Sequence, residues 1–192
     1  HLEKFCGLYT GMSSRLEEFV DLFPIHPSYI DVFNKLYLIE NRHILKNIST
    51  TIKGIFDTTV PENAPGIISF DNYWPAIKSN GLLKSDPTIS RVVGASQQLE
   101  DIITRAFPKP AYKPMAMQII YALSVHRLTT NGLDVQFGMT AENLKDDLCL
   151  YMLMPEQDAD FLLSAVKVTL KEIMTTVSGC LLYTSPSPRD CS

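Results

Sequence analysis

Residues 114–128 read PMAMQIIYALSVHRL, and apolar side chains fall on nearly every face of the helix that this stretch predicts. Pro114 suits the first turn of such a helix, because a missing backbone N–H costs nothing there. A helix that is apolar all round is normally buried by other elements. We therefore expect helix 114–128 to lie at the centre of a helical domain.

Further helices are predicted on both sides of this segment. Apolar residues recur every three or four positions in 88–107, 140–151 and 158–178, and in helices of the first 57 residues. Thr140 is placed to cap helix 140–151. Short β-favouring pieces occur at 67–70 and 133–137. The sequence thus predicts a mainly α fold with at most short strands.

Three segments and a tail are expected. Residues 1–57 form a helical bundle, 58–87 a connector rich in Pro and Gly, and 88–179 a second helical domain. The helix count of this second domain is that of a winged-helix-like unit, with the wing hairpin expected just after Gly179, where the predicted tail interrupts it. Residues 180–192 look like an in-frame translation of a sequencing adapter, so we expect a non-native tail; a natural Ser/Pro-rich tail is the alternative.

The amino-acid composition limits the classes of protein to which this chain can belong. The chain has 192 residues, 45% of them hydrophobic, which is enough for a real core. Its 17 basic and 21 acidic residues give a net charge of −4, which argues against a surface built to neutralise many phosphates of a duplex. No apolar run reaches the roughly 20 residues of a membrane span. We expect a soluble, cytoplasmic protein, and a helical pattern already under way at Leu2 predicts that it is an internal fragment.

Motifs of a self-contained enzyme are missing from the sequence. It has no phosphate-binding glycine loop, no paired histidines with metal-ligand spacing and no nucleophile elbow. Cys6 and Cys149 lie on apolar helical patterns, which is typical of buried, reduced cysteines. We expect the fragment alone to lack a complete active site and to bind no cofactor or metal by itself.

Five segments carry a family resemblance. They are FPIHPSYIDVF (23–33), ENRHILKNIS (40–49), PGIISFDNYW (65–74), ALSVHRLTT (122–130) and GMTAENLKDDLCLY (138–151). In this order they resemble the large ATP-binding protein of bacterial BREX-type phage-exclusion systems, of the phage growth limitation protein Y kind, downstream of its P-loop core. The resemblance implies that residues 1–57 are a lid-like part of an ATPase that uses ATP and Mg²⁺ in the parent protein. It also implies other phage-defence subunits as partners.

Within that picture Arg42 is the candidate for cofactor binding, because ATPases of this type use an arginine on a lid helix to contact the γ-phosphate. The alternative is a surface pair with Glu40. His26, in the rigid elbow Ile25-His26-Pro27, is a candidate hinge group that responds to lid movement. The alternative is an imidazole that satisfies a turn. No residue is assigned a catalytic or metal-binding role.

Two further features have two readings each. Asp71, Tyr73 and Trp74 form either a partner-docking edge or an N-cap followed by two aromatic anchors. Helix 140–151 carries Glu142, Asp146 and Asp147 against one lysine, so we expect protein contact or inter-domain packing rather than DNA contact. The alternative function is a non-enzymatic winged-helix module that binds DNA or serves as an adaptor.

Overall fold

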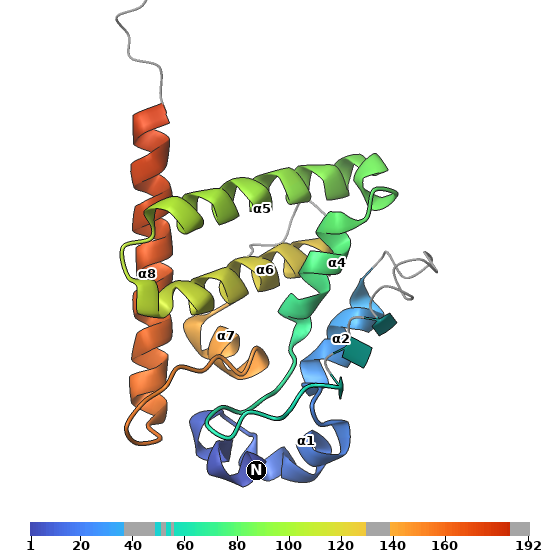
Figure 1. The fold of residues 1–192 in the computed structure, drawn as a ribbon, viewed down its shortest axis with the longest axis vertical. Coiled ribbons are helices and arrows are strands. Elements are labelled where there is room, and N and C mark those ends of the chain that lie inside the picture. The colour runs from blue at the N-terminus through green and yellow to red at the C-terminus, as the bar shows by residue number, and fades with distance from the viewer. Residues whose placement is uncertain (37–48, 51–52, 55, 130–138, 185–192) are drawn as a thin grey trace, which may run out of the picture.

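The structure, a computed structural model, describes residues 1–36, 49–50, 53–54, 56–129 and 139–184, with the backbone alone for 180–184. These residues are mainly helical, as predicted (Figure 1). The α-helices are α1 (Leu16–Leu22), α2 (Pro27–Lys35), α4 (Tyr73–Ser79), α5 (Pro87–Ala106), α6 (Lys113–Thr129), α7 (Ala141–Asp147) and α8 (Ala159–Thr184). Short 3-10 turns cover Leu2–Lys4, Cys6–Leu8, Ser13–Arg15, Phe70–Asn72, Leu83–Ser85 and Pro110–Tyr112.

Helix α6 lies at the centre, which confirms the prediction from its composition. Ala116, Ile119, Ala122 and Val125 are fully buried. The helix contacts α2, α4, α5 and α8 and the 3-10 turn at Phe70–Asn72. An all-round apolar helix is stable in water only when it is covered on this many sides.

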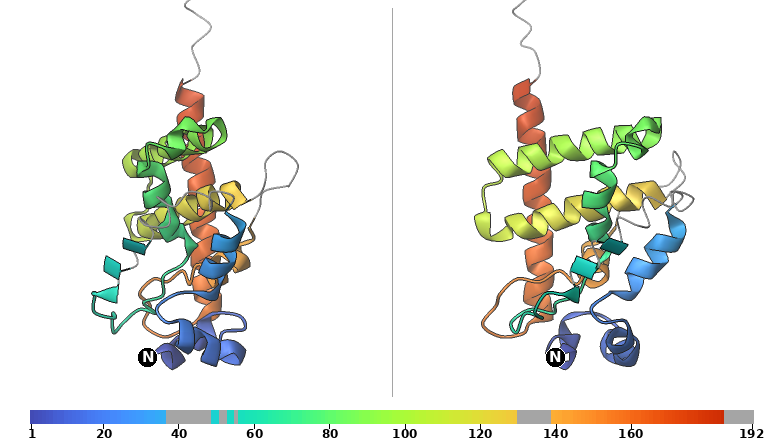
Figure 2. Two further views of the ribbon diagram at one scale, coloured as in Figure 1. Left: turned by 90° about the vertical axis from the view of Figure 1, so that its right-hand side faces the viewer. Right: turned by 45° about the vertical axis from the view of Figure 1, so that its right-hand side comes forward.

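Helix α5 runs antiparallel beside α6, and α8 crosses both of them (Figures 1 and 2). Asp86 begins α5, because its Oδ1 accepts from the backbone N–H groups of Thr88 at 2.8 Å and Ile89 at 3.1 Å. Ser96 and Ser124 then meet across the two helices with their hydroxyl oxygens 2.9 Å apart. Beyond α5, the last turns of α8 extend past the other helices (Figure 1).

One hydrophobic core joins residues from all three predicted segments. It includes Phe5 and Phe19 from residues 1–57, Trp74 from 58–87, and Leu128 and Leu162 from 88–179. A smaller cluster of Ile103, Phe107, Ala116 and Ile120 closes the joined ends of α5 and α6. The three-segment division stays a prediction, but these parts share one interior.

The predicted strand at 67–70 is reduced to an isolated parallel bridge between Ile25 and Ile68. In this bridge the His26 N–H donates to the Ile68 carbonyl at 2.9 Å and the Ile68 N–H donates to the Pro24 carbonyl at 2.7 Å. The pairing does not extend, because Pro24 has no N–H to donate on one side, and on the other side α2 begins at Pro27 and the Ser28 N–H bonds His26. The second predicted strand, 133–137, lies outside the described residues.

Helix α8 continues beyond its predicted end near Ser178. It runs to Thr184, into the segment predicted as a non-native tail, and the winged-helix assignment stays a prediction. The physical reason for the longer helix is that no proline follows until Pro186, and a single glycine lowers helix stability by only about 1 kcal/mol. In the part of the chain that the structure describes, no helix is long and apolar enough to cross a membrane.

Candidate functional site

Of the two site residues predicted from the sequence, the structure describes His26 but not Arg42. Arg42 and its neighbour Glu40 lie in 37–48, outside the described residues, so the phosphate-contact assignment stays a prediction. His26 is described, and only 5% of its surface is exposed.

His26 caps the first turn of α2. Its Nδ1 accepts a hydrogen bond from the backbone N–H of Ser28 at 3.0 Å, and the ring also bonds to the backbone of Asp146. The edge of the Phe19 ring packs against it, with 5.0 Å between the ring centroids. Burial lowers the pKa of His26 to about 4, so the imidazole is neutral at pH 7. The ring therefore ties α2 to the end of α7, and its role as a hinge stays a prediction.

Side chains from distant segments bond the backbone at the end of α7, at residues 146–150, which we call the carbonyl row. Helix C-termini leave carbonyls without intrahelical partners, so these side chains satisfy groups that would otherwise need water. The contacts are His26 to Asp146, Ser28 to Asp147 (3.0 Å), Ser69 to Leu148 (3.0 Å), and Tyr9 to Cys149 (3.3 Å) and Leu150 (2.9 Å). The imidazole and the three hydroxyls are thus engaged in holding the fold together.

Cys149 closes α7 in a left-handed conformation, with φ of 43°. The Leu150 N–H donates to the Lys145 carbonyl at 3.1 Å and the Cys149 N–H to the Asp146 carbonyl at 3.3 Å, the two bonds of a Schellman motif. Glycine usually occupies this position. Burial raises the pKa of the Cys149 thiol, which disfavours the nucleophilic thiolate. Helix α7 therefore ends at Asp147, before the predicted end at residue 151.

Asp71, Tyr73 and Trp74 are interior residues. Tyr73 and Trp74 are fully buried and Asp71 is 5% exposed. The Ser69 hydroxyl donates to Asp71 Oδ1 at 2.5 Å, and burial raises the pKa of Asp71 to about 6. The reading of these residues as a docking edge is wrong, because burial leaves them no surface to offer. The two aromatics are anchors, but Asp71 is not an N-cap, because it lies inside the 3-10 turn and α4 follows Asn72 without a side-chain cap.

An apolar groove of about 380 Å³ opens between α5, α6 and α8. We call it the α5–α6 groove. Its apolar walls include Val92 and Leu99 of α5, Leu123 of α6 and Ile173 of α8. Leu123 is 40% exposed, although most of α6 is buried.

Two arginines lie at one end of the α5–α6 groove. Arg91 comes from the second turn of α5 and Arg127 from the last turn of α6, and both are exposed. Because the two helices are antiparallel, the start of one lies beside the end of the other. The groove is therefore apolar along its length and positively charged at one end.

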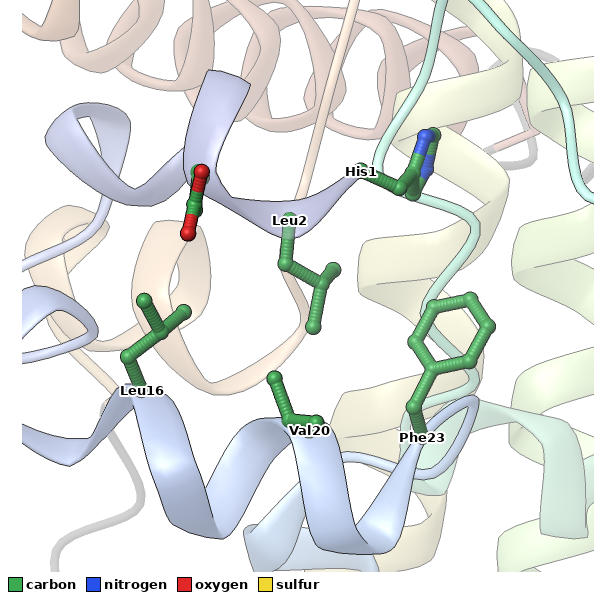
Figure 3. Close-up of a pocket in the computed structure, with 6 residues that line it drawn as sticks. His1, Leu2, Leu16, Val20 and Phe23 are labelled. Atoms are coloured by element: carbon green, nitrogen blue, oxygen red, sulfur yellow. The ribbon is translucent and has the colours of Figure 1, made fainter.

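A second hollow, of about 340 Å³, lies between the first 3-10 turn and α1 (Figure 3). Leu2, Leu16, Val20 and Phe23 give it an apolar lining. His1 points along its rim, and the ring Nε2 is 3.1 Å from the carbonyl of Pro65. Its polar ring is thus already engaged with the connector.

Among the described residues, no group of three His, Cys, Asp or Glu side chains is placed to hold a metal ion. The cysteines described there, Cys6 and Cys149, are both free.

Sequence reasoning missed both the carbonyl row and the α5–α6 groove. The row joins residues that lie 79 to 141 positions apart, and no local pattern encodes such pairs. The groove did have a signal, because helix 114–128 is apolar on more faces than one core can cover. The many apolar residues of this helix predicted a central position, but they did not predict that Leu123 would be exposed.

Comparison with known proteins gives one match. Residues 1–189 match the family model described as the DUF6079 second domain. No curated protein and no solved structure matches the chain.

Proposed function

Because this chain belongs to the DUF6079 second-domain family, we propose that it is a non-catalytic helical interaction domain of a larger, cytoplasmic ATP-binding protein that acts in phage defence. The observation that carries the interaction role is the exposed α5–α6 groove with its charged end. The ATPase and phage-defence parts rest on the resemblance to BREX-type proteins.

The description of the family as a second domain supports a parent protein with several domains. In that parent, the P-loop core supplies the phosphate pocket, and ATP and Mg²⁺ bind there. Residues 1–57 then act as a lid over the pocket, with Arg42 contacting the γ-phosphate. Other phage-defence subunits are the proposed partners of the helical part.

The uses of the buried polar groups also support a non-catalytic role. An imidazole or a hydroxyl can act as a base or a nucleophile in an enzyme. The described groups of this kind at the end of α7 each bond the carbonyl row instead: His26, Ser28, Ser69 and Tyr9. A general base must reach a proton on a substrate, and a nucleophile must be accessible to one. These groups instead face the protein interior.

The charge of α7 supports protein contact over DNA contact. Lys145, the only lysine of the predicted helix 140–151, is 4% exposed and pairs with Asp146 at 2.6 Å. Glu142 is exposed at the start of the same helix. Duplex phosphates would meet acidic rather than basic side chains on this element.

ATP hydrolysis by the parent protein tests the proposal. Arg42→Ala should lower the rate of phosphate release about tenfold or more while changing nucleotide affinity only modestly, because the contact forms with the γ-phosphate in the transition state. Arg105→Ala is the matched control, since Arg105 is exposed on α5 and donates to the Asp101 carbonyl of the same helix. An unchanged rate in Arg42→Ala would remove the assigned role.

The 192-residue chain supplies the second arm of this test. Purified alone, it should release no phosphate from ATP with Mg²⁺ at a rate above the buffer. Turnover by the isolated chain would overturn the non-catalytic assignment.

A further inference from the structure

The hollow between the first 3-10 turn and α1, which we call the N-terminal hollow, is open and apolar. Figure 3 shows Leu2 of the 3-10 turn directed toward α1, from which Leu16 and Val20 point back toward it. Leu2 is only 6% exposed, but Val20 on the opposite wall is 57% exposed. The two walls therefore leave room for a further apolar side chain between them.

A smaller hollow lies directly beside the first one, because Phe23 lines both of them. This connector hollow, of about 240 Å³, lies between Phe23 and the residues that lead into the connector, and Phe56 and Val60 are part of its wall. Phe56 is 54% exposed and Val60 is 42% exposed. Exposed apolar residues that occur singly are normal, whereas a contiguous group of them marks an interaction surface. The two hollows form such a surface around Phe23.

The chemistry of this surface selects apolar protein side chains. Among the described residues that line the two hollows, there is no lysine or arginine, so the phosphates of a nucleic acid would meet no cation. The polar ring of His1 at the rim is already 3.1 Å from the carbonyl of Pro65. An apolar side chain that enters therefore covers carbon without taking a hydrogen bond from the histidine.

The position of His1 indicates where that apolar group comes from. Its ring centroid lies 5.4 Å from that of Phe5 and 6.2 Å from that of Phe23, and its Nε2 contacts Pro65. Contacts of this kind hold a residue in place. Consecutive Cα atoms are about 3.8 Å apart, so a residue that precedes His1 in a longer protein lies at the rim of the N-terminal hollow.

The family supplies such a longer protein, since residues 1–189 match a domain described as the second one. A first domain that is tied to the rim of the hollow by a linker has an effective concentration there on the order of millimolar. A separate subunit has no such advantage for a modest apolar contact. The tether therefore favours the first domain of the parent as the occupant.

We propose that the N-terminal hollow and the connector hollow together form the surface on which the first domain of the parent protein docks, with apolar side chains of that domain covering Val20, Phe23, Phe56 and Val60. The inference rests on the proposed function, because it needs a parent with several domains. It goes beyond that function by assigning the surface that joins two of these domains.

Thiol labelling of the parent protein and of the 192-residue chain tests whether the surface is covered. Val20→Cys is introduced into both proteins, and mass spectrometry of peptides separates position 20 from Cys6 and Cys149. Labelling at position 20 should be at least about tenfold slower in the parent, because the docked domain excludes the reagent. Leu82→Cys is the matched control, since Leu82 is 62% exposed and lines neither hollow, and it should react at similar rates in both proteins. Equal rates at position 20 in the two proteins would overturn the proposal.

Photo-crosslinking in the parent identifies what covers the surface. A benzophenone side chain in place of Val20 should cross-link to a peptide that precedes His1. A mixture of parent protein with light and heavy nitrogen should give no mixed products, because the contact is within one chain. Cross-links to a second copy or to a segment after residue 192 would overturn the proposal, and so would a lack of any cross-link.

Acidic substitutions test whether the contact is apolar. In the parent, Val60→Cys should be labelled slowly, and adding Val20→Asp with Phe56→Asp should raise its rate to that of the isolated chain, since carboxylates resist burial. Both positions are more than half exposed, so the variant should fold, which circular dichroism checks. Adding Leu82→Asp instead should leave the labelling slow. Continued protection of position 60 in the doubly acidic variant would contradict an apolar docking surface.

Failure of the proposed function gives a different pattern. If Arg42→Ala leaves the ATPase rate unchanged while position 20 is protected in the parent, the lid assignment fails and the docking surface stands. If the rate falls but position 20 reacts equally in both proteins, the docking surface fails and the ATPase role stands.

Discussion

His26 and Asp71 are two buried titratable residues whose pKa values move in opposite senses for the same reason. Burial disfavours the charged form of each, so it lowers the pKa of His26 to about 4 and raises the pKa of Asp71 to about 6. Between about pH 4 and 6.5, His26 is protonated more in the unfolded chain than in the folded one. The contribution of His26 to the free energy of unfolding therefore falls as the pH falls. The folded chain holds more protons on Asp71 between about pH 4 and 6, so that contribution falls as the pH rises.

The two contributions should nearly cancel in the unaltered chain. Asp71→Asn removes one of them, so this variant should lose about 3 kcal/mol more than the unaltered chain on acidification from pH 6.5 to 4. His26→Asn keeps an oxygen to cap α2 and should change in the opposite sense. The measurement is urea denaturation at several pH values and constant ionic strength. The prediction would be contradicted if the free energy of unfolding changed with pH in the same way for the unaltered chain and both variants.

Helix α7 shows which parts of an element can be predicted from sequence and which cannot. Its start was predicted at Thr140, and Thr140 Oγ1 accepts from the Asn143 N–H at 3.1 Å, because capping is encoded within four residues. Its end was predicted four residues too late. The helix stops where Cys149 turns left-handed and where distant side chains bond the carbonyl row. No local pattern in the sequence contains that information.

The same limit applies to the candidate sites. Helix 114–128 was correctly placed at the centre from its composition alone, since burial follows from an apolar surface. The groove beside it depends on how α5 and α8 lie against α6. Arg91 and Arg127 are 36 positions apart in the sequence, and only the antiparallel packing of their helices puts them at one end of a groove.

The attachment of α7 to the N-terminal residues depends on Lys145. Its Nζ donates to the carbonyl of Leu8, pairs with Asp146 at 2.6 Å and lies 5.3 Å from the centre of the Tyr9 ring. Lys145→Met should lower the free energy of unfolding by about 3 kcal/mol, because it leaves a carbonyl and a half-buried carboxylate without their cation. Chemical denaturation measures the change.

A second lysine pair provides the control for this prediction. Lys167 pairs with Glu142 at 3.3 Å, and both side chains are more than half exposed. Lys167→Met should leave the denaturation midpoint unchanged within error, since solvent screens such pairs. Equal effects of the two substitutions would show that Lys145 does not hold α7 in place.

At the scale of the whole molecule, the described helices share one interior. The main core runs from Leu2 to Val166 and includes fully buried Trp74. Because this main core crosses all three predicted segments, they should unfold together.

Trp74 is the only tryptophan, so its fluorescence reports on one place in this core. Its unfolding curve in urea should coincide with the curve from far-ultraviolet circular dichroism, which reports on all helices. One transition with one midpoint is the expected result. Two separated midpoints would instead support independent domains at 1–57 and 88–179.

The carbonyl row also constrains the order of events during synthesis. The Tyr9 hydroxyl bonds the carbonyl of Leu150, 141 positions later in the chain. At about 5–20 residues per second, a ribosome needs on the order of ten seconds to make that partner after Tyr9 has been added. Until then Phe5 also lacks the Tyr151 ring, whose centroid lies 5.6 Å from its own, so the first 3-10 turns stay without part of their cover during synthesis.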